Sequence, residues 1–390
     1  MSKARLFTSL CSMAFLVNLV RVVYAPLVEP LQQAFAIGPG TVGLVVTLVW
    51  AGSALPRIPV GYLLTVLPRH HVVLLSGAML TGASVVAALA NSVLTLGAGA
   101  FLLGTATGAY FVAANPLLSE LYVSEVGRRL GIHGTASQVA AVLAAPLVTL
   151  ALTISWRVVF VVVAVVALVT TAVFYRVAKR VEFPAASGVD RNFRGAVAAE
   201  WRLIVVGVVT FGAASFVWQG LFNFYPSYLE TARGFSPAFS RTLLTVMFAA
   251  GVPAFWLSGT IVDRVRVAPY ILGVIVAFVG SLLLLTVTNG LVGIVVLSAV
   301  IGYVIHSMFP AADAFLLSAL PDEHRGGAYA TFSGGMMFSQ ALGSWFVGEV
   351  VELGIGYDTV FQALAVVLAV VIGGLALLAT TGRLPSITEA

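Results

Sequence analysis

Charged residues are scarce in this chain. Lys, Arg, Asp and Glu together make up 9% of its 390 residues, whereas soluble domains carry roughly 25%, because their surfaces face water. Apolar residues reach 60% and the mean hydropathy is +1.05. This composition excludes a soluble protein and predicts an integral membrane protein.

Cysteine is almost absent as well, since Cys11 is the single one. A disulfide framework is therefore excluded. The sequence also lacks a Walker loop, a Gly-rich dinucleotide motif, a metal-ligand cluster and a nucleophile elbow. We therefore expect neither an enzyme nor a primary pump, and no cofactor or metal. The first apolar run has no clear small-residue cleavage site, so we expect it to span the membrane rather than to be removed.

Apolar runs of membrane-spanning length fill most of the chain. They are continuous, without the alternation of barrel strands, and so predict an all-α membrane protein with 12 transmembrane helices. The predicted spans cover residues 6–28, 41–64, 72–90, 94–118, 132–152, 157–176, 203–228, 238–261, 268–288, 291–318, 327–348 and 359–380.

Basic residues give the predicted orientation. The net charge of +5 would favour nucleic acid in a soluble protein, but here most Lys and Arg residues fall at the termini and in the even-numbered loops. The opposite loops hold only Arg157, Arg233 and Arg241. The positive-inside rule then places both termini in the cytoplasm of a multi-pass cell (inner) membrane protein. We expect the lipid bilayer, and no nucleic acid, as its partner.

The two halves of the chain resemble each other. Gly61-Tyr-Leu-Leu-Thr65 parallels Gly259-Thr-Ile-Val-Asp263 at a shift of 198 positions. Leu117-Leu-Ser-Glu-Leu121 parallels Leu316-Leu-Ser-Ala-Leu320 at a shift of 199. We predict two pseudo-symmetric six-helix bundles, an arrangement typical of rocker-type transporters with a site between the halves. The predicted division is a bundle over 1–176, a cytoplasmic linker over 177–202 and a bundle over 203–390.

The stretch Gly259-Thr-Ile-Val-Asp263-Arg264 resembles the signature loop of the major facilitator superfamily, Gly-x-x-x-Asp-Arg. The resemblance implies the fold of that superfamily, transport by alternating access, and a cytoplasmic gate held by Gly259, Asp263 and Arg264. In the first-half copy Thr65 and Val66 replace the acidic and basic residues, which implies a weaker latch there.

Two branches of the superfamily are compared through their motifs. Arg57-Ile-Pro59-Val-Gly61 is similar to the nitrate/nitrite porters, which place an anion-binding arginine there; the second arginine of that branch is replaced by Phe255. Gly99-Ala-Phe-Leu-Leu-Gly104 lacks the span-four arginine of drug/proton antiporters. The resemblance thus favours a small-anion carrier over multidrug efflux.

Arg21 lies deep in the first predicted span, where a charge costs a few kcal/mol. It is about 22 Å from the cytoplasmic start of the span at roughly 1.5 Å per residue. Asn18 and Tyr24 share a broad face with it. Its guanidinium suits a carboxylate or nitrate-like oxyanion, but a structural salt bridge is the alternative. Arg57, in span two, is expected either to bind substrate or to belong to the gate.

Span ten carries His306 and Asp313, two helical turns apart on one face. A carboxylate and an imidazole inside a membrane are typical of a proton relay, so we predict a proton-coupling role for both. The alternatives are that Asp313 neutralises an arginine and that His306 bonds a neighbouring hydroxyl. The remaining polar residues are expected to line the substrate path or to join helices; they are Tyr110, Asn115, Gln138, Gln219, Asn223 and Gln340.

We therefore predict a monomeric secondary transporter of a small organic or inorganic anion, moved by alternating access and coupled to protons, by symport or antiport. One alternative is proton-driven export of hydrophobic or cationic compounds, in which Asp313 meets the substrate and the arginines are structural. The other is a non-transporting membrane receptor.

Overall fold

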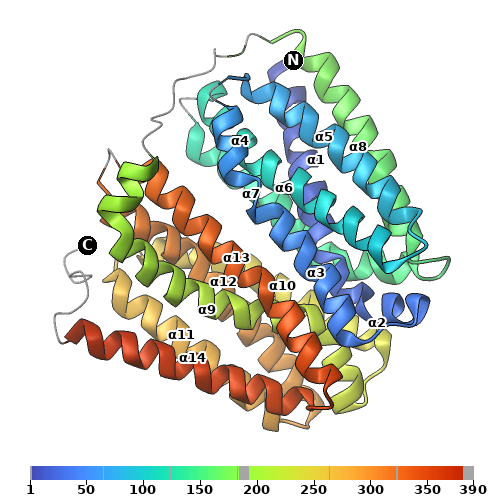
Figure 1. Ribbon diagram of the computed structural model, residues 1–390, viewed down its shortest axis with the longest axis vertical. Coiled ribbons are helices and arrows are strands. Elements are labelled where there is room, and N and C mark those ends of the chain that lie inside the picture. Colours follow the sequence, from blue (N-terminus) through green and yellow to red (C-terminus); the bar gives the residue numbers. More distant parts are fainter. Residues whose placement is uncertain are drawn as a thin grey trace. The chain divides into compact units, whose positions relative to one another are not determined.

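The computed structural model describes residues 2–64, 66–122, 125–181, 183, 193–262, 264–321 and 324–380. Every regular element in these ranges is a helix, numbered α1 to α14 in Figure 1. The all-α fold predicted from the apolar runs is thus confirmed. The chain divides into two compact units, unit 1 (Met1–Val189) and unit 2 (Asp190–Ala390), and the division falls inside the predicted linker.

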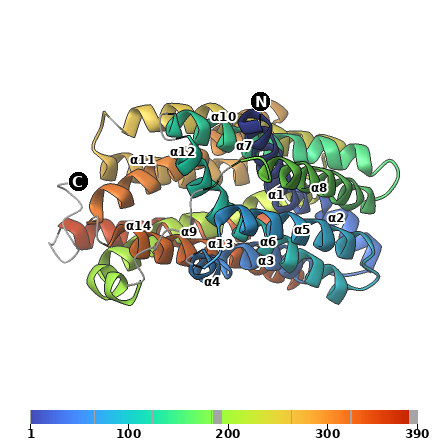
Figure 2. The ribbon, with the colours of Figure 1, turned by 90° about the horizontal axis from the view of Figure 1, so that it is seen from above.

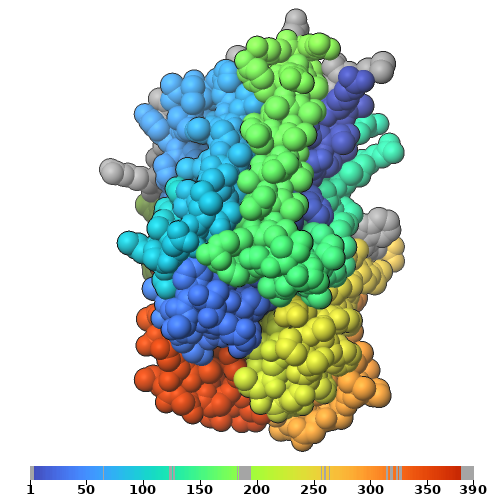
Figure 3. All heavy atoms as spheres, turned by 90° about the vertical axis from the view of Figure 1, so that its right-hand side faces the viewer, coloured from blue at the N-terminus to red at the C-terminus, as the bar shows by residue number. Residues whose placement is uncertain are grey.

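Unit 1 packs around α1 and α6. Helix α1 contacts α7, α8 and α6, while α6 also contacts α3 and α5. Figure 3 shows α8 (bright green) on the surface of this unit between α5 and α1. The helices are α1 (Ser2–Val22), α2 (Tyr24–Phe35), α3 (Pro39–Ala54), α4 (Arg57–Leu63), α5 (Arg69–Ala88), α6 (Val93–Leu121), α7 (Val126–Ala151) and α8 (Arg157–Ala178).

Prolines divide the first two predicted spans. The first breaks at Val23, between α1 and α2, because Pro26 has no N–H to donate to the carbonyl four residues earlier. The second breaks at Leu55 and Pro56, between α3 and α4, for the same reason. Each break lies close to an arginine, Arg21 in the first case and Arg57 in the second.

Unit 2 is built from α9 (Phe193–Arg233), α10 (Pro237–Val262), α11 (Val267–Val287), α12 (Leu291–Ala319), α13 (Arg325–Glu352) and α14 (Tyr357–Thr380). The closest pairs are α9 with α13 and α10 with α12, and α11 runs beside α14 in both ribbon views (Figures 1 and 2). Helix α9 begins at Phe193, so residues 193–202, which were predicted as linker, are helical. Burial of Ala196 and a hydrogen bond from Nδ1 of His324 to Oε1 of Glu200, at 3.0 Å, hold this first part of α9.

Membrane-crossing length and composition are met by 11 stretches of the described chain, with α3 and α4 counted together. Helix α13 has 28 residues but falls outside this set, because Gly, Ser and Gln lower its hydropathy. It matches the predicted span 327–348, and with it the 12 predicted spans are accounted for. On α8, exposed Val161, Val165 and Val169 form the kind of surface that faces lipid.

Glycines bring equivalent helix pairs into close contact in the two units. A Cβ on Gly104 of α6 would overlap the carbonyl of Val49 on α3, and a Cβ on Gly302 of α12 would overlap that of Met247 on α10. Both residues of the second pair follow those of the first by 198 positions, the shift seen in the sequence. The internal repeat therefore extends to the packing of its helices.

A variation occurs one turn further along the same interface. In unit 1 the small residue is Gly108 of α6, which packs on the carbonyl of Ser53 of α3. The equivalent positions in unit 2 are His306 of α12 and Gly251 of α10, and here a Cβ on the glycine would lie 2.6 Å from the imidazole Cγ. The glycine has changed helix, and His306 fills the space that it leaves.

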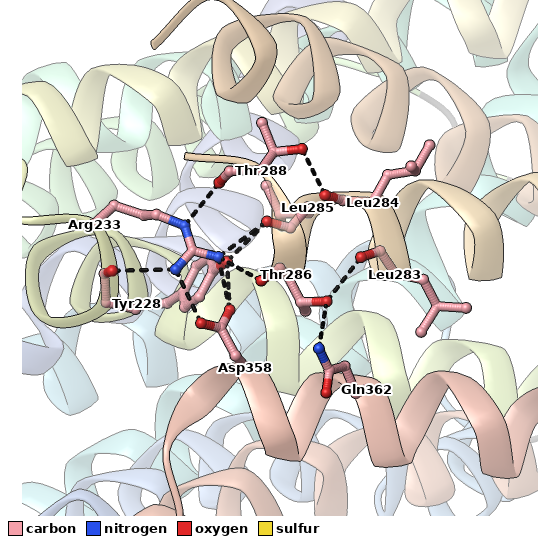
Figure 4. A network of polar contacts seen from close by, with 10 residues as sticks. Tyr228, Arg233, Leu283, Leu284, Leu285, Thr286, Thr288, Asp358 and Gln362 are labelled. Atoms are coloured by element: carbon pink, nitrogen blue, oxygen red, sulfur yellow. Dashed lines mark hydrogen bonds and ion pairs between the residues drawn. The ribbon is translucent and has the colours of Figure 1, made fainter. Parts of the chain in front are cut away.

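One arginine joins three helices of unit 2 (Figure 4). Arg233, at the end of α9, donates from Nη1 and Nη2 to the Asp358 carboxylate of α14 at 2.9 and 2.8 Å. It also donates to carbonyls of Leu285, Thr286 and Thr288 at the end of α11. The arginine thereby satisfies carbonyls that a helix end leaves open.

Candidate functional site

Arg21 lies in the last turn of α1, two residues before the break at Val23. Its Nη2 donates to Oδ1 of Asn18 at 2.6 Å. The amide nitrogen of Asn18 in turn donates to the carbonyl of Ser137 on α7 at 2.7 Å. Asn18 therefore links α1 to α7 and holds the guanidinium in one orientation.

Two aromatic rings cover this guanidinium. Its Cζ lies 4.6 Å from the ring centre of Trp50 on α3 and 5.6 Å from that of Phe111 on α6. Rings at these distances stabilise a cation through their π faces. We name the four residues Asn18, Arg21, Trp50 and Phe111 the arginine cluster. Its members come from α1, α3 and α6, and Ser137 adds α7.

Among the described residues, the arginine cluster carries positive charge without a matching carboxylate. Within the described ranges Arg21 forms no ion pair, and its Nε is buried without a hydrogen-bond partner. The charge that acts on it comes from another cation, Arg57, half-buried at the start of α4. A buried cation is costly unless an anion joins it, so this arrangement suits binding of an anion.

A second polar group lies in the same unit. Tyr110 of α6 is fully buried, and its hydroxyl donates to the carbonyl of Leu10 at 2.6 Å. The hydroxyl oxygen also lies 2.8 Å from Nε2 of His133 on α7. Sequence reasoning named Tyr110 but missed His133, although a histidine inside an apolar run is a visible signal. Tyr24 was predicted to share a helix face with Arg21 and Asn18. It packs on Phe160 of α8 instead of joining the arginine cluster.

The other predicted residues of unit 1 make no hydrogen bond with the arginine cluster among the described residues. Asn115 is exposed on α6, and its carbonyl accepts a bond from Ser119. Gln138 is half-buried on α7, next to Ser137. At the end of α6, Glu120 pairs with Arg69 of α5 at 2.6 Å. This ion pair joins two helices at the loop where the acidic and basic signature residues are missing.

Unit 2 holds a buried amide cluster between α9 and α13. Nε2 of Gln340 donates to Oε1 of Gln219 at 2.9 Å, and Asn223 donates to the Ser344 hydroxyl at 3.0 Å. Nε2 of Gln219 and Oδ1 of Asn223 are buried without partners. Hydrogen bonds of side-chain amides thus join α9 to α13, as the hydrogen bond of Asn18 joins α1 to α7.

His306 is 4% exposed and surrounded by aromatic rings. Its Nδ1 donates to the carbonyl of Gly302 at 2.7 Å. The ring centres around it, at 5.4 to 6.2 Å, are those of Trp218, Phe248, Phe255 and Phe309. These rings pack His306 between α9, α10 and α12, and its proton-coupling role stays a prediction.

Two predicted positions fall partly or wholly outside the described residues. The side chain of Asp313 on α12 is outside them, and so is Asp263 in the signature loop. Gly259 lies in α10, and Arg264 is exposed in the turn that follows this helix. The coupling role of Asp313 and the gate therefore stay predictions. In the described part of the chain, no three His, Cys, Asp or Glu residues gather as metal ligands do.

Comparison with protein families decides the family. Scanned against family models, the chain matches the Major Facilitator Superfamily over residues 10–297 and 243–389. The chain belongs to the Major Facilitator Superfamily. No curated protein matches it by sequence.

Solved structures of other proteins share the superfamily fold. A nucleoside transporter, NupG, superimposes with a TM-score of 0.80 at 14% identity, covering 95% of this chain and 99% of its own. A D-xylose–proton symporter gives 0.76 at 16% identity with full coverage of both chains. A bacterial homologue of the lysosomal transporter Spinster, inward-facing and occupied, gives 0.77 at 16% identity and 98% coverage of each. Such identities show the fold of this superfamily member and leave its solute open.

Proposed function

We propose that this superfamily member is a secondary transporter that carries a small organic or inorganic anion across the membrane by alternating access, coupled to protons. The observation that carries the proposal is Arg21. It is a guanidinium held by Asn18 between two aromatic rings, with its Nε unsatisfied and without an ion pair in the described part of the chain.

The geometry favours an oxyanion over a cation or a sugar. A guanidinium offers donors in one plane and binds a carboxylate or nitrate-like group with charge-assisted bonds. The rings of Trp50 and Phe111 cover it, which leaves its edge for the solute. Arg57 adds a second positive charge to the same region and would repel cationic compounds.

Membrane potential supports coupling to protons. Moving one charge across the membrane changes the free energy by about 2.3 kcal/mol per 100 mV, which opposes anion entry into a negative interior. One proton carried with a monovalent anion removes this cost. Asp313 is proposed as a coupling residue from its position on α12, as in the sequence prediction.

Arg21 can be tested by uptake into proteoliposomes that contain the full-length protein. We expect Arg21→Gln to lower affinity for the transported anion about 10- to 100-fold, because a charge-assisted bidentate bond contributes about 1.5–3 kcal/mol. Arg21→Lys should be intermediate, since lysine keeps the charge but not the planar donors. The probes are labelled nitrate, lactate and succinate.

Arg128→Gln is the matched control, because the Arg128 side chain is 74% exposed at the start of α7. Its uptake should equal that of the wild type. Uptake that survives Arg21→Gln would contradict the anion proposal. Loss of ethidium export in Asp313→Asn, with normal export in Arg21→Gln, would support export of cationic compounds instead.

A further inference from the structure

His133 is a buried imidazole with one nitrogen engaged. Its side chain is 2% exposed on α7. The single hydroxyl proton of Tyr110 goes to the carbonyl of Leu10, so the hydroxyl oxygen accepts from Nε2–H of His133. The neutral tautomer is thereby fixed, with the lone pair on Nδ1. In the described part of the chain Nδ1 has no hydrogen-bond partner.

This imidazole is a neighbour of the arginine cluster. The ring centre of Phe111 lies 6.1 Å from that of His133 and 5.6 Å from Cζ of Arg21. His133 also precedes Ser137 by one helical turn on α7, and Ser137 supplies the carbonyl that holds Asn18. Anion and imidazole would therefore be separated by about one aromatic ring.

We propose that His133 binds the proton that accompanies the anion at Arg21; this inference rests on the proposed function. The proton adds to the lone pair of Nδ1 and turns the imidazole into an imidazolium. The Nε2–H bond to Tyr110 is kept, so protonation needs no change of tautomer or partner. An incoming anion and this proton then enter as a neutral pair.

The charged and titratable groups on the helices around His133 determine how anion binding affects its protonation. On α1, Arg21 is the charged residue beyond Phe111, and Cys11 interacts with Tyr110. On α7, Arg129 lies one turn before His133 and pairs with Glu125. On α6, Tyr110 is the titratable contact, and no described titratable group of α2 or α8 makes a hydrogen bond, ion pair or ring contact with His133.

An anion bound at Arg21 would place a negative charge about one aromatic ring from His133 and would favour the imidazolium. Binding of the anion then strengthens binding of the proton, and by linkage the proton strengthens binding of the anion by the same factor. The sign follows: affinity for the anion is highest at low pH, where His133 is protonated, and falls as the pH rises through the titration of the imidazole.

Calorimetry of the purified full-length protein with nitrate and lactate tests the proposal. Titrations at about pH 6, in buffers of different ionisation enthalpy, count the protons taken up per anion. We expect the wild type to take up protons, up to one per anion, and to bind about tenfold more weakly at pH 8. His133→Gln should take up none and should bind at both pH values with the affinity of the wild type at pH 8.

His306→Gln is the competing variant, because His306 is also a buried imidazole with one nitrogen on a carbonyl and is the histidine that the sequence predicts to couple protons. It should keep the proton uptake. Uptake that persists in His133→Gln, or that disappears only in His306→Gln, would overturn the inference. A wild type that binds neither anion would instead overturn the proposed function.

Tyr110→Phe keeps the proposal testable if His133→Gln does not fold. This change removes the acceptor of Nε2–H and frees the tautomer of His133. The pH at which half of the proton uptake is lost should then shift. An unchanged pH profile would contradict a proton site at His133.

Discussion

Asn18 uses both ends of its amide, and this decides how Arg21 is presented. The nitrogen donates to Ser137 and the oxygen accepts from Arg21, so neither group is left to rotate. Nη2 of Arg21 is thus occupied, while Nε remains unsatisfied. A solute that satisfies Nε completes the hydrogen bonding of a site that is already oriented.

Asn18→Asp tests this arrangement with a change of a few atoms. The new carboxylate would stand beside Nη2 and act as a tethered competitor of the anion. We expect affinity for nitrate or lactate to fall at least about tenfold, as for a lost charge-assisted bond. Calorimetry measures this, with Asn91→Asp, at an exposed position, as the control. Unaltered affinity would mean that Arg21 does not bind the anion.

Sequence reasoning found those members of the site that contrast with their surroundings. Arg21 and Asn18 stand out in an apolar run, and their spacing places them on one face. Trp50 and Phe111 give no such contrast among apolar residues, and only the packing of α3 and α6 brings them to the guanidinium. Tyr24 has the right spacing, but the break at Val23 turns it toward Phe160.

At the scale of helices, the sequence predicts the membrane spans but not the positions at which two of them are interrupted. Membrane helices tolerate proline when neighbouring groups satisfy the freed carbonyl. Pro26 and Pro56 accompany breaks, whereas other prolines lie within continuous helices, namely Pro116, Pro146, Pro226, Pro253 and Pro310. Which proline interrupts a helix depends on tertiary contacts that the local sequence does not contain.

Close helix contacts at glycine make a prediction at this scale. Gly104→Ala should lower the free energy of unfolding by about 1–3 kcal/mol, because the methyl group meets the backbone of α3, which cannot move aside alone. Gly302→Ala should behave alike in unit 2. Unfolding in detergent, followed by circular dichroism, measures both.

Gly82→Ala serves as the control for these variants. Gly82 lies in α5 with no atom within 4 Å of an added Cβ. Alanine there should be neutral or should stabilise the helix by up to about 1 kcal/mol. If Gly104→Ala were as stable as Gly82→Ala, the close contact of α3 with α6 would not limit stability.

At the scale of the molecule, each unit has its own buried interior. The repeat shift and the distribution of basic residues indicated two halves of six spans. The start of α9 did not follow from these signals, because residues 193–202 are polar enough to resemble a linker yet bury Ala196 and hydrogen-bond Glu200 to His324. Helical structure there depends on contacts with α13 that composition does not reveal.

Independent interiors predict that damage to one unit stays within it. Arg233→Met should cost on the order of 3 kcal/mol, because it leaves the Asp358 carboxylate without its counter-ion and removes a donor from three carbonyls. Asp358→Asn should cost less, since that carboxylate is 36% exposed. Hydrogen exchange should rise in α11 and α14 and stay unchanged in α1 to α8. Faster exchange in both units would argue against separate interiors.

The glycine at the helix contact lies on α6 in unit 1, as Gly108, and on α10 in unit 2, as Gly251. This difference indicates how the two halves of a repeat diverge. Ser53 with Gly108 and Gly251 with His306 fill the same gap from opposite sides. Had one helix gained its bulk before the other lost its own, the two would have collided; in the reverse order, a void would have opened. A duplicated interface of this kind keeps one glycine at the contact but not the helix that carries it. Imidazole chemistry can therefore enter one half of the molecule without a counterpart in the other.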